Sequence, residues 1–117
     1  MPDFPSIEGV DVPEGIRRFG GNSALYFRFL ARFAEDSTMQ LLQNAFSSGD
    51  YASAFQHAHT LKGLSAQLSI HALFSSCCAL CDQLRSGMPE NPVQAKAVFE
   101  QITAAYEKLL AQLSTLP

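Results

Sequence analysis

The residues best suited to chemistry in this chain lie in one short stretch, HAHTLKGLSAQL, at positions 57–68. It holds two histidines, His57 and His59, and a lysine, Lys62, three positions after the second histidine. An imidazole is a nucleophile near neutral pH, and an ammonium group binds anions. Gly63 interrupts a helical pattern, where glycine costs about 1 kcal/mol relative to alanine. The glycine therefore needs a packing or functional reason.

The two histidines face nearly opposite directions if this stretch is helical. With His59 at zero and about 100° per residue, His57 lies at about 160° and Lys62 at about −60°. The side opposite His59 is apolar and forms the expected core stripe: Ala54, Leu61, Leu64 and Leu68. We therefore expect His59 to be exposed and His57 to pack at the edge of the core. Side chains that point apart cannot bind one metal ion together.

Small side chains surround His59 on the helical wheel. They are Ala52, Gly63 and Ala66. Because they are small, another protein can approach the imidazole closely, and Gln56 and Gln67, which flank the patch, are candidate docking contacts. Lys62, one turn along, can reach an anion attached to the ring, and a phosphoryl group is the obvious anion. The spacing alone also fits a solvated surface histidine.

Helical periodicity and capping residues recur along the chain, whereas the alternation typical of strands is missing. The expected helices cover residues 13–19, 23–33, 37–46, 51–68, 70–85 and 92–113. The expected N-terminal caps are Asn22 or Ser23, Ser37 in a capping box with Gln40, Asp50, Ser69 and Asn91. Amphipathic helices joined by brief turns predict an all-α fold, an antiparallel four-helix bundle with a short N-terminal capping helix.

Length and composition predict a single domain over residues 1–117. The chain is 47% hydrophobic, its formal net charge is −3, and its basic residues do not cluster. These features argue against binding to nucleic acid or to an anionic membrane and favour a protein partner. No apolar run is long enough to cross a bilayer, and the first residues, MPDFPSIEG, lack the features of a signal peptide. We therefore expect a cytoplasmic protein without membrane contact.

The cysteines offer a different class of function. Cys77, Cys78 and Cys81 crowd together and, with His71, suggest a metal or redox site. Cys77 and Cys81, however, share a helical face with three leucines, where a small buried hydrophobe fits well. A fourth convincing ligand is missing. Core packing is therefore the preferred interpretation, and we expect neither a metal nor a cofactor in this chain.

The chain resembles the histidine phosphotransfer (HPt) domains of multistep phosphorelays. That family carries H-x-x-K-G within a longer pattern of the type A-H-x-L-K-G-x-x-A-x-x-G, and residues 58–68 here are AHTLKGLSAQL. The resemblance extends to GVDVPEGIRRFGGNSALYFRFLARFAEDS near the N-terminus, to the GDY turn and to LFSSCCALCDQLRSG. Two positions depart from the family: Gln67, where asparagine or serine is usual, and Ser69, where glycine is usual. These departures concern partner fit and the end of the helix more than phosphotransfer.

The resemblance implies a role for each residue of the motif. His59 would accept the phosphoryl group, Lys62 would support its charge, and Gly63 would admit the partner. It also implies response-regulator receiver domains as partners, with Mg²⁺ on the receiver, and a sensor histidine kinase upstream. We expect a monomeric phosphoryl carrier, not an enzyme, either free-standing or part of a larger hybrid kinase.

Two related interpretations remain as alternatives. A kinase dimerisation and phosphoacceptor hairpin typically has an acidic residue directly after its histidine, whereas Thr60 follows His59, and no glycine-rich nucleotide-binding segment is present. A bundle that binds receivers without accepting phosphate would not need His59, Lys62 and Gly63 together.

Overall fold

The computed structural model describes residues 4–116, and these form six α-helices and no strand. The helices are α1 Val12–Arg18, α2 Ser23–Ala34, α3 Thr38–Ser47, α4 Tyr51–Gln67, α5 His71–Leu84 and α6 Pro92–Leu113. The all-α prediction is therefore confirmed. The expected four long helices are not matched one for one, because α2 and α3 are separated by a turn and five helices have ten or more residues.

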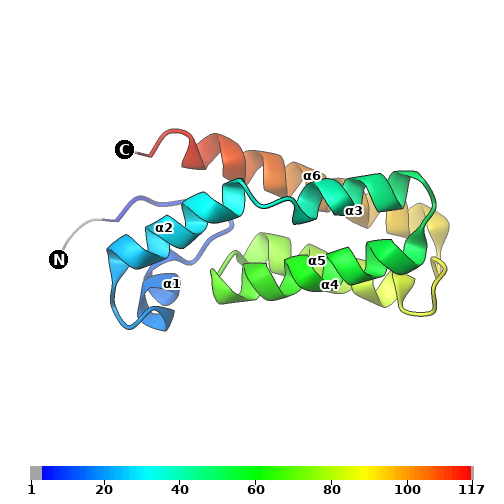
Figure 1. Ribbon diagram of the computed structural model, residues 1–117, viewed down its shortest axis with the longest axis horizontal. Coiled ribbons are helices and arrows are strands. Elements are labelled where there is room, and N and C mark those ends of the chain that lie inside the picture. Colours follow the sequence, from blue (N-terminus) through cyan, green and yellow to red (C-terminus); the bar gives the residue numbers. More distant parts are fainter. Residues whose placement is uncertain (1–3, 117) are drawn as a thin grey trace.

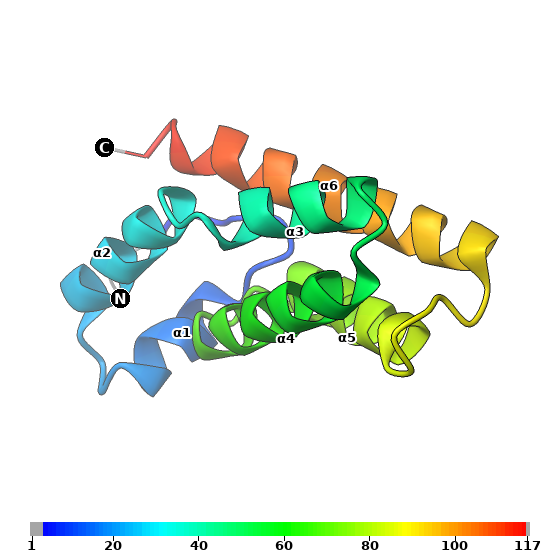
Figure 2. The same cartoon turned by 45° about the vertical axis from the view of Figure 1, so that its right-hand side comes forward.

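The helices from α3 to α6 run back and forth along the long axis of the molecule (Figure 1). Helix α4 packs between α3 and α5, and α5 packs against α6. Seen from the second direction, α3 and α6 form one layer above α4 and α5 (Figure 2). Phe46 of α3 stacks on Phe99 of α6, with ring centroids 4.3 Å apart, so the first and last helices of this group are also in contact. One long face of α4 consequently stays uncovered.

Three of the expected caps start their helices. The side chains of Asn22, Asp50 and Asn91 accept hydrogen bonds from the backbone N–H groups of Leu25, Ser53 and Gln94 at 3.0, 3.2 and 3.1 Å. Pro92 follows Asn91 at the start of α6, where its missing N–H is not needed. The hydrogen bonds from Ser53 hold the pKa of the Asp50 carboxyl below its usual value. Asp50 therefore fixes the start of α4.

The capping box expected at Ser37 does not form. The Ser37 side chain makes no capping hydrogen bond. Instead, a carboxylate oxygen of Asp36 accepts from the backbone N–H of Thr38 at 2.8 Å, and the Gln40 side chain donates to Asn44 at 3.0 Å. A charged acceptor one residue earlier replaces the hydroxyl, and the glutamine extends along its own helix.

Ser69 was expected to cap α5 but ends α4 instead. Its φ is +57°, the left-handed conformation that follows many helices. The N–H of Ile70 donates to the carbonyl of Ser65 at 2.9 Å, and the N–H of Ser69 donates to the carbonyl of Ala66 at 3.3 Å. This pair of bonds is the Schellman arrangement, in which glycine is favoured. The backbone conformation thus explains why the resembled pattern has glycine at this position.

Helix α1 is fastened to the turn between α4 and α5 through Glu14. Its carboxylate accepts from the Ser69 hydroxyl at 2.9 Å, lies 3.2 Å from the His71 ring nitrogen, and pairs with Arg18 at 3.3 Å. The Ser69 hydrogen bond and the two basic neighbours hold the pKa of Glu14 below its usual value. Nearby, the buried Tyr26 hydroxyl donates to the Leu68 carbonyl at 2.7 Å. The end of α4 is therefore tied to both N-terminal helices.

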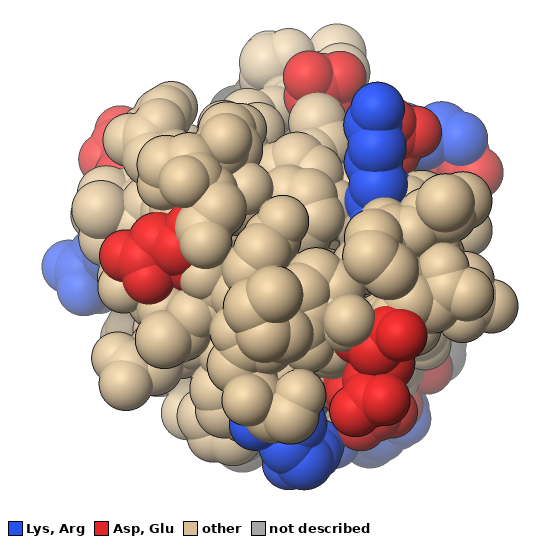
Figure 3. Space-filling view, turned by 90° about the vertical axis from the view of Figure 1, so that its right-hand side faces the viewer, with Lys and Arg blue, Asp and Glu red and all other residues tan. Residues whose placement is uncertain are grey.

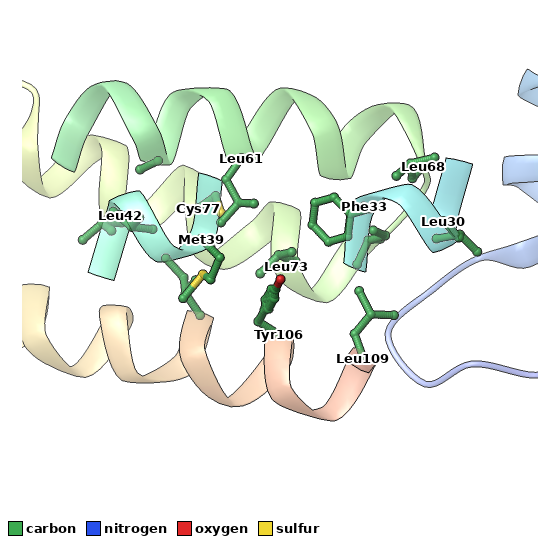
Figure 4. Close-up of a cluster of buried hydrophobic side chains, with 14 of the residues drawn as sticks. Leu30, Phe33, Met39, Leu42, Leu61, Leu68, Leu73, Cys77, Tyr106 and Leu109 are labelled. Carbon is green, nitrogen blue, oxygen red and sulfur yellow. The ribbon is translucent and has the colours of Figure 1, made fainter. Parts of the chain in front are cut away.

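The core is aliphatic and aromatic along its whole length (Figure 4). Leu42, Leu61, Leu73 and Leu109 are almost fully buried, and Cys77 lies among them with no exposed surface. Among residues 4–116, no helix is both long and apolar enough for a bilayer crossing. The end of the molecule where α3 turns into α4 carries mostly uncharged side chains, and several of its acidic and basic side chains lie next to one another (Figure 3).

Candidate functional site

The uncovered face of α4 carries most of the residues singled out in the sequence. Its exposed positions recur at three- and four-residue steps: Ala52, Gln56, His59, Thr60, Gly63 and Gln67. His57 is half-buried, as expected, and Lys62 and Ala66 are half-buried at the edge of this face. The structure therefore brings His59, Gly63 and both glutamines together on one open surface, with Lys62 beside them.

The buried side of α4 is rotated from the expected stripe. Ala54, Leu61 and Leu68 are buried as predicted, but Leu64 is only half-buried, and Ala58 and Ser65 fill the core in its place. The Ser65 hydroxyl donates to the Leu61 and Lys62 carbonyls at 2.7 and 3.0 Å, so this buried hydroxyl is satisfied within its own helix. Small side chains at these positions let α4 approach its neighbours.

This rotation changes the place of Gly63. Ala54, Ala58, Leu61 and Ser65 centre on a direction about 170° from Gly63, so the glycine lies opposite the core. A Cβ atom built at Gly63 meets no atom within 4 Å, and Gly63 is not among the residues with positive φ. Neither close packing nor backbone conformation within the described residues requires a glycine there.

His59 is backed by an aromatic side chain that sequence reasoning missed. The Phe55 ring lies one turn earlier, with its centroid 6.3 Å from that of His59 and the planes inclined by 23°. The guanidinium carbon of Arg85 lies 5.8 Å from the Phe55 centroid, and Arg85 pairs with Asp82 at 3.1 Å. The four-residue spacing between Phe55 and His59 is the signal that could have indicated this pair.

Lys62 lies on the side of α4 that faces α5. Its positive charge opposes the effect of burial on the thiols of Cys77 and Cys81. The ion pairs among residues 4–116 join Glu14, Asp82 and Glu8 to other cations, and none uses Lys62. Its ammonium is thus available to an anion brought to the α4 surface.

The structure does not support a metal or redox site at the cysteines. Burial raises the pKa of Cys77 to about 12 and raises that of Cys81 as well, which keeps both thiols protonated and inert. His71 lies with Asp11 and Glu14, whose ligand-type atoms all fall within 4.8 Å of one another. Ser69 and Arg18 donate hydrogen bonds to Glu14 in this cluster, so its structural role in holding α1 against the turn after α4 explains why these residues lie together.

One comparison with known proteins identifies the family of the chain. The family model described as "Hpt domain" matches residues 28–115, about three quarters of the chain, and this match includes all of α3, α4, α5 and α6 and the second half of α2. The chain belongs to the Hpt domain family. No curated protein and no solved structure was found to match it.

Membership of the family sets the coarse function. Hpt domains are phosphocarrier modules of two-component phosphorelays rather than enzymes, and they work with receiver domains through a phosphohistidine. The three residues of the H-x-x-K-G motif, His59, Lys62 and Gly63, lie within the matched range, on or beside the uncovered face of α4.

Proposed function

We propose that His59 accepts a phosphoryl group from a receiver-domain phospho-aspartate and passes it to another receiver. The observation that carries the proposal is the open surface around an exposed imidazole, beside a glycine opposite the core that no packing contact among the described residues requires. The other histidines are less suited. His57 is half-buried, and His71 lies 3.2 Å from the Glu14 carboxylate beside α1.

The transfer needs one nucleophile from this chain. A lone pair of the neutral His59 imidazole attacks phosphorus, an N–P bond forms, the P–O bond to the aspartate breaks, and the carboxylate leaves with the bonding electrons. The proton on the other ring nitrogen stays there or exchanges with solvent. Reversal of the same step, with a second receiver's carboxylate as nucleophile, discharges the domain. Mg²⁺ on the receiver supplies charge stabilisation, and this chain brings no cofactor of its own.

Lys62 supports the phosphoryl charge in this proposal. It lies one turn beyond His59 and has no ion-pair partner among the described residues. A charge-assisted hydrogen bond from its ammonium to a phosphoryl oxygen is stronger than a neutral one and strengthens as negative charge arrives at the ring.

Docking uses the face that surrounds His59. Gly63 and Ala52 allow close approach, Ala66 extends the small surface, and Gln56 and Gln67 offer side-chain amides at its borders. We further propose that α2 to α6 represent the family's helical bundle, with α1 as an N-terminal cap. The domain acts as a cytoplasmic monomer and receives its phosphate through a receiver that a sensor histidine kinase has charged.

The decisive experiment incubates the domain with phosphorylated receiver and locates the phosphate by mass spectrometry at neutral or alkaline pH, which preserves phosphohistidine. We expect modification of His59 alone, its loss in His59→Gln, and its retention in His57→Gln and His71→Gln. Labelling of His59→Gln at the wild-type rate would reject the assignment. A receiver complex without any transfer would support the alternative of a bundle that only binds receivers.

A further inference from the structure

A chain of contacts leads from the surface of α5 to the imidazole of His59. Asp82 pairs with Arg85 at 3.1 Å, the Arg85 guanidinium carbon lies 5.8 Å from the centroid of the Phe55 ring, and that ring stacks on His59. Two helices contribute, since Phe55 and His59 belong to α4 whereas Asp82 and Arg85 come from the end of α5. None of the family motif residues other than His59 takes part in it.

The geometry of the stack leaves the reactive edge of His59 free. The ring planes are inclined by only 23° and the centroids lie 6.3 Å apart, so Phe55 lies nearly parallel to the imidazole as an offset neighbour on one side of it. The nitrogen lone pair lies in the ring plane and projects from the edge, where an approaching phosphorus atom can meet it. A helical side chain leans toward the preceding turn, which places His59 over Phe55 without strain. The stack therefore restricts rotation of the imidazole while exposing its nucleophile.

Arg85 and Asp82 hold the support in place. Phe55 is only half-buried, so core packing alone does not fix its ring. A guanidinium over an aromatic face is attractive, and the ion pair with Asp82 limits where the guanidinium can go. Both charged side chains are exposed, with 64% and 75% of their side-chain surface accessible. Their contacts lie on the surface, outside the hydrophobic core, and keep the Phe55 ring beside His59.

We propose that Phe55 is a positioning residue for phosphoryl transfer, holding the His59 imidazole edge-on to the partner, and that Arg85 acts through Phe55. The inference rests on the proposed function of His59. Rates of group transfer depend strongly on the orientation of the nucleophile, and a displacement of about 1 Å can lower them by about 100-fold. A pre-oriented ring speeds the chemical step, whereas it adds nothing to the affinity for the receiver.

The test separates the chemical step from docking by single-turnover transfer from phosphorylated receiver at increasing receiver concentration. Phe55→Leu should lower the maximum rate by about three- to tenfold and leave the half-saturating concentration within about twofold. Arg85→Ala should lower the maximum rate by about two- to fourfold, and Arg85→Lys should restore part of it. In the Phe55→Leu background, Arg85→Ala should have no further effect.

A matched control comes from a second arginine and phenylalanine pair. Arg32 lies over Phe29 on α2, with its guanidinium carbon 5.5 Å from the ring centroid, and among the described residues the aromatic pair of Phe29 is with Phe19 and not with a histidine. Phe29→Leu and Arg32→Ala remove the same chemical groups and should leave the maximum rate unchanged. If Phe55→Leu melts far below the wild type, the kinetic test relies on Arg85→Ala and Arg85→Lys, because Arg85 is exposed and its replacement should not unfold the domain.

Two outcomes would overturn the positioning role. In one, Arg85→Ala lowers the maximum transfer rate by the same factor in the wild type and in the Phe55→Leu background. That result would mean that Arg85 acts on the partner or the phosphoryl group directly. The other is a change in half-saturation alone. Proton NMR gives a readout independent of transfer, because the His59 ring protons should lose a ring-current shift in Phe55→Leu. A wild-type stack seen by NMR in a domain that takes no phosphate would instead refute the proposed function, and the positioning role with it.

Discussion

Gly63 offers the sharpest separation of stability from function. It lies inside α4, opposite the core, and a Cβ atom there meets no neighbour within 4 Å. Replacing an exposed helical glycine by alanine stabilises a helix by up to about 1 kcal/mol. For a domain of this size, that gain raises the melting temperature by about 3–5 °C. Gly63→Gln should also melt at or above the wild type, because glutamine is a good helix former with open space around it.

Transfer should respond in the opposite direction. In the proposed complex, a side chain at Gly63 projects from the face that the receiver covers to reach His59. If the added atoms force the two surfaces apart at a cost of about 1–3 kcal/mol, affinity falls by about 5- to 150-fold. We expect a small loss for Gly63→Ala and a loss within this range for Gly63→Gln, measured by calorimetry with a receiver and by single-turnover transfer.

The control places the same substitution on a remote helix. Ala97 is an exposed position of α6, and Ala97→Gln should change neither melting nor receiver affinity. A Gly63→Gln protein that melts normally and transfers at the wild-type rate would refute the access role. It would also mean that the receiver approaches His59 from a direction other than across Gly63.

Two further perturbations test other parts of the molecule. Lys62→Ala should slow transfer or shorten the phosphohistidine lifetime by about tenfold or more with little change in melting, because it removes a charge-assisted bond to the phosphoryl group; unchanged kinetics and lifetime would reject the role. Glu14 has a pKa lowered by Ser69, His71 and Arg18, so its ionised form stabilises the fold above the unfolded-state value of about 4.5, and that contribution is lost as the pH falls through the folded-state pKa. Urea midpoints should therefore fall less steeply on acidification in Glu14→Gln than in the wild type, and equal slopes would contradict this.

The sequence predicted the helices well because their ends are decided locally. Asn22, Asp50 and Asn91 each bind a backbone N–H three residues ahead, an interaction that depends on neighbours in the chain alone. Ser69 could not be placed in this way. Serine is a common N-cap, so the sequence suggested that role. In the structure Ser69 has a left-handed backbone conformation, and its hydroxyl donates a hydrogen bond to Glu14, 55 residues earlier in the chain.

The site was predictable to the same local extent. Exposure of His59 and partial burial of His57 follow from helical spacing and are confirmed. The direction of the core was misjudged, because hydrophobicity favours Leu64 over Ser65, whereas the serine hydroxyl is satisfied within its own helix. The support behind His59 was missed, since Arg85 reaches Phe55 from another helix.

The succession of helices also bears on how quickly the chain finds its fold. From α3 to α6 each helix packs against the next one along the chain, and such low contact order predicts folding within microseconds to milliseconds. The N-terminal segment differs, because Asp11 bonds to Ser69 and Glu8 pairs with Lys108, 100 residues away. We expect this segment to join after the rate-limiting barrier, so that loss of the Lys108 pair, as in Lys108→Ala, speeds unfolding and leaves the refolding rate in stopped-flow unchanged.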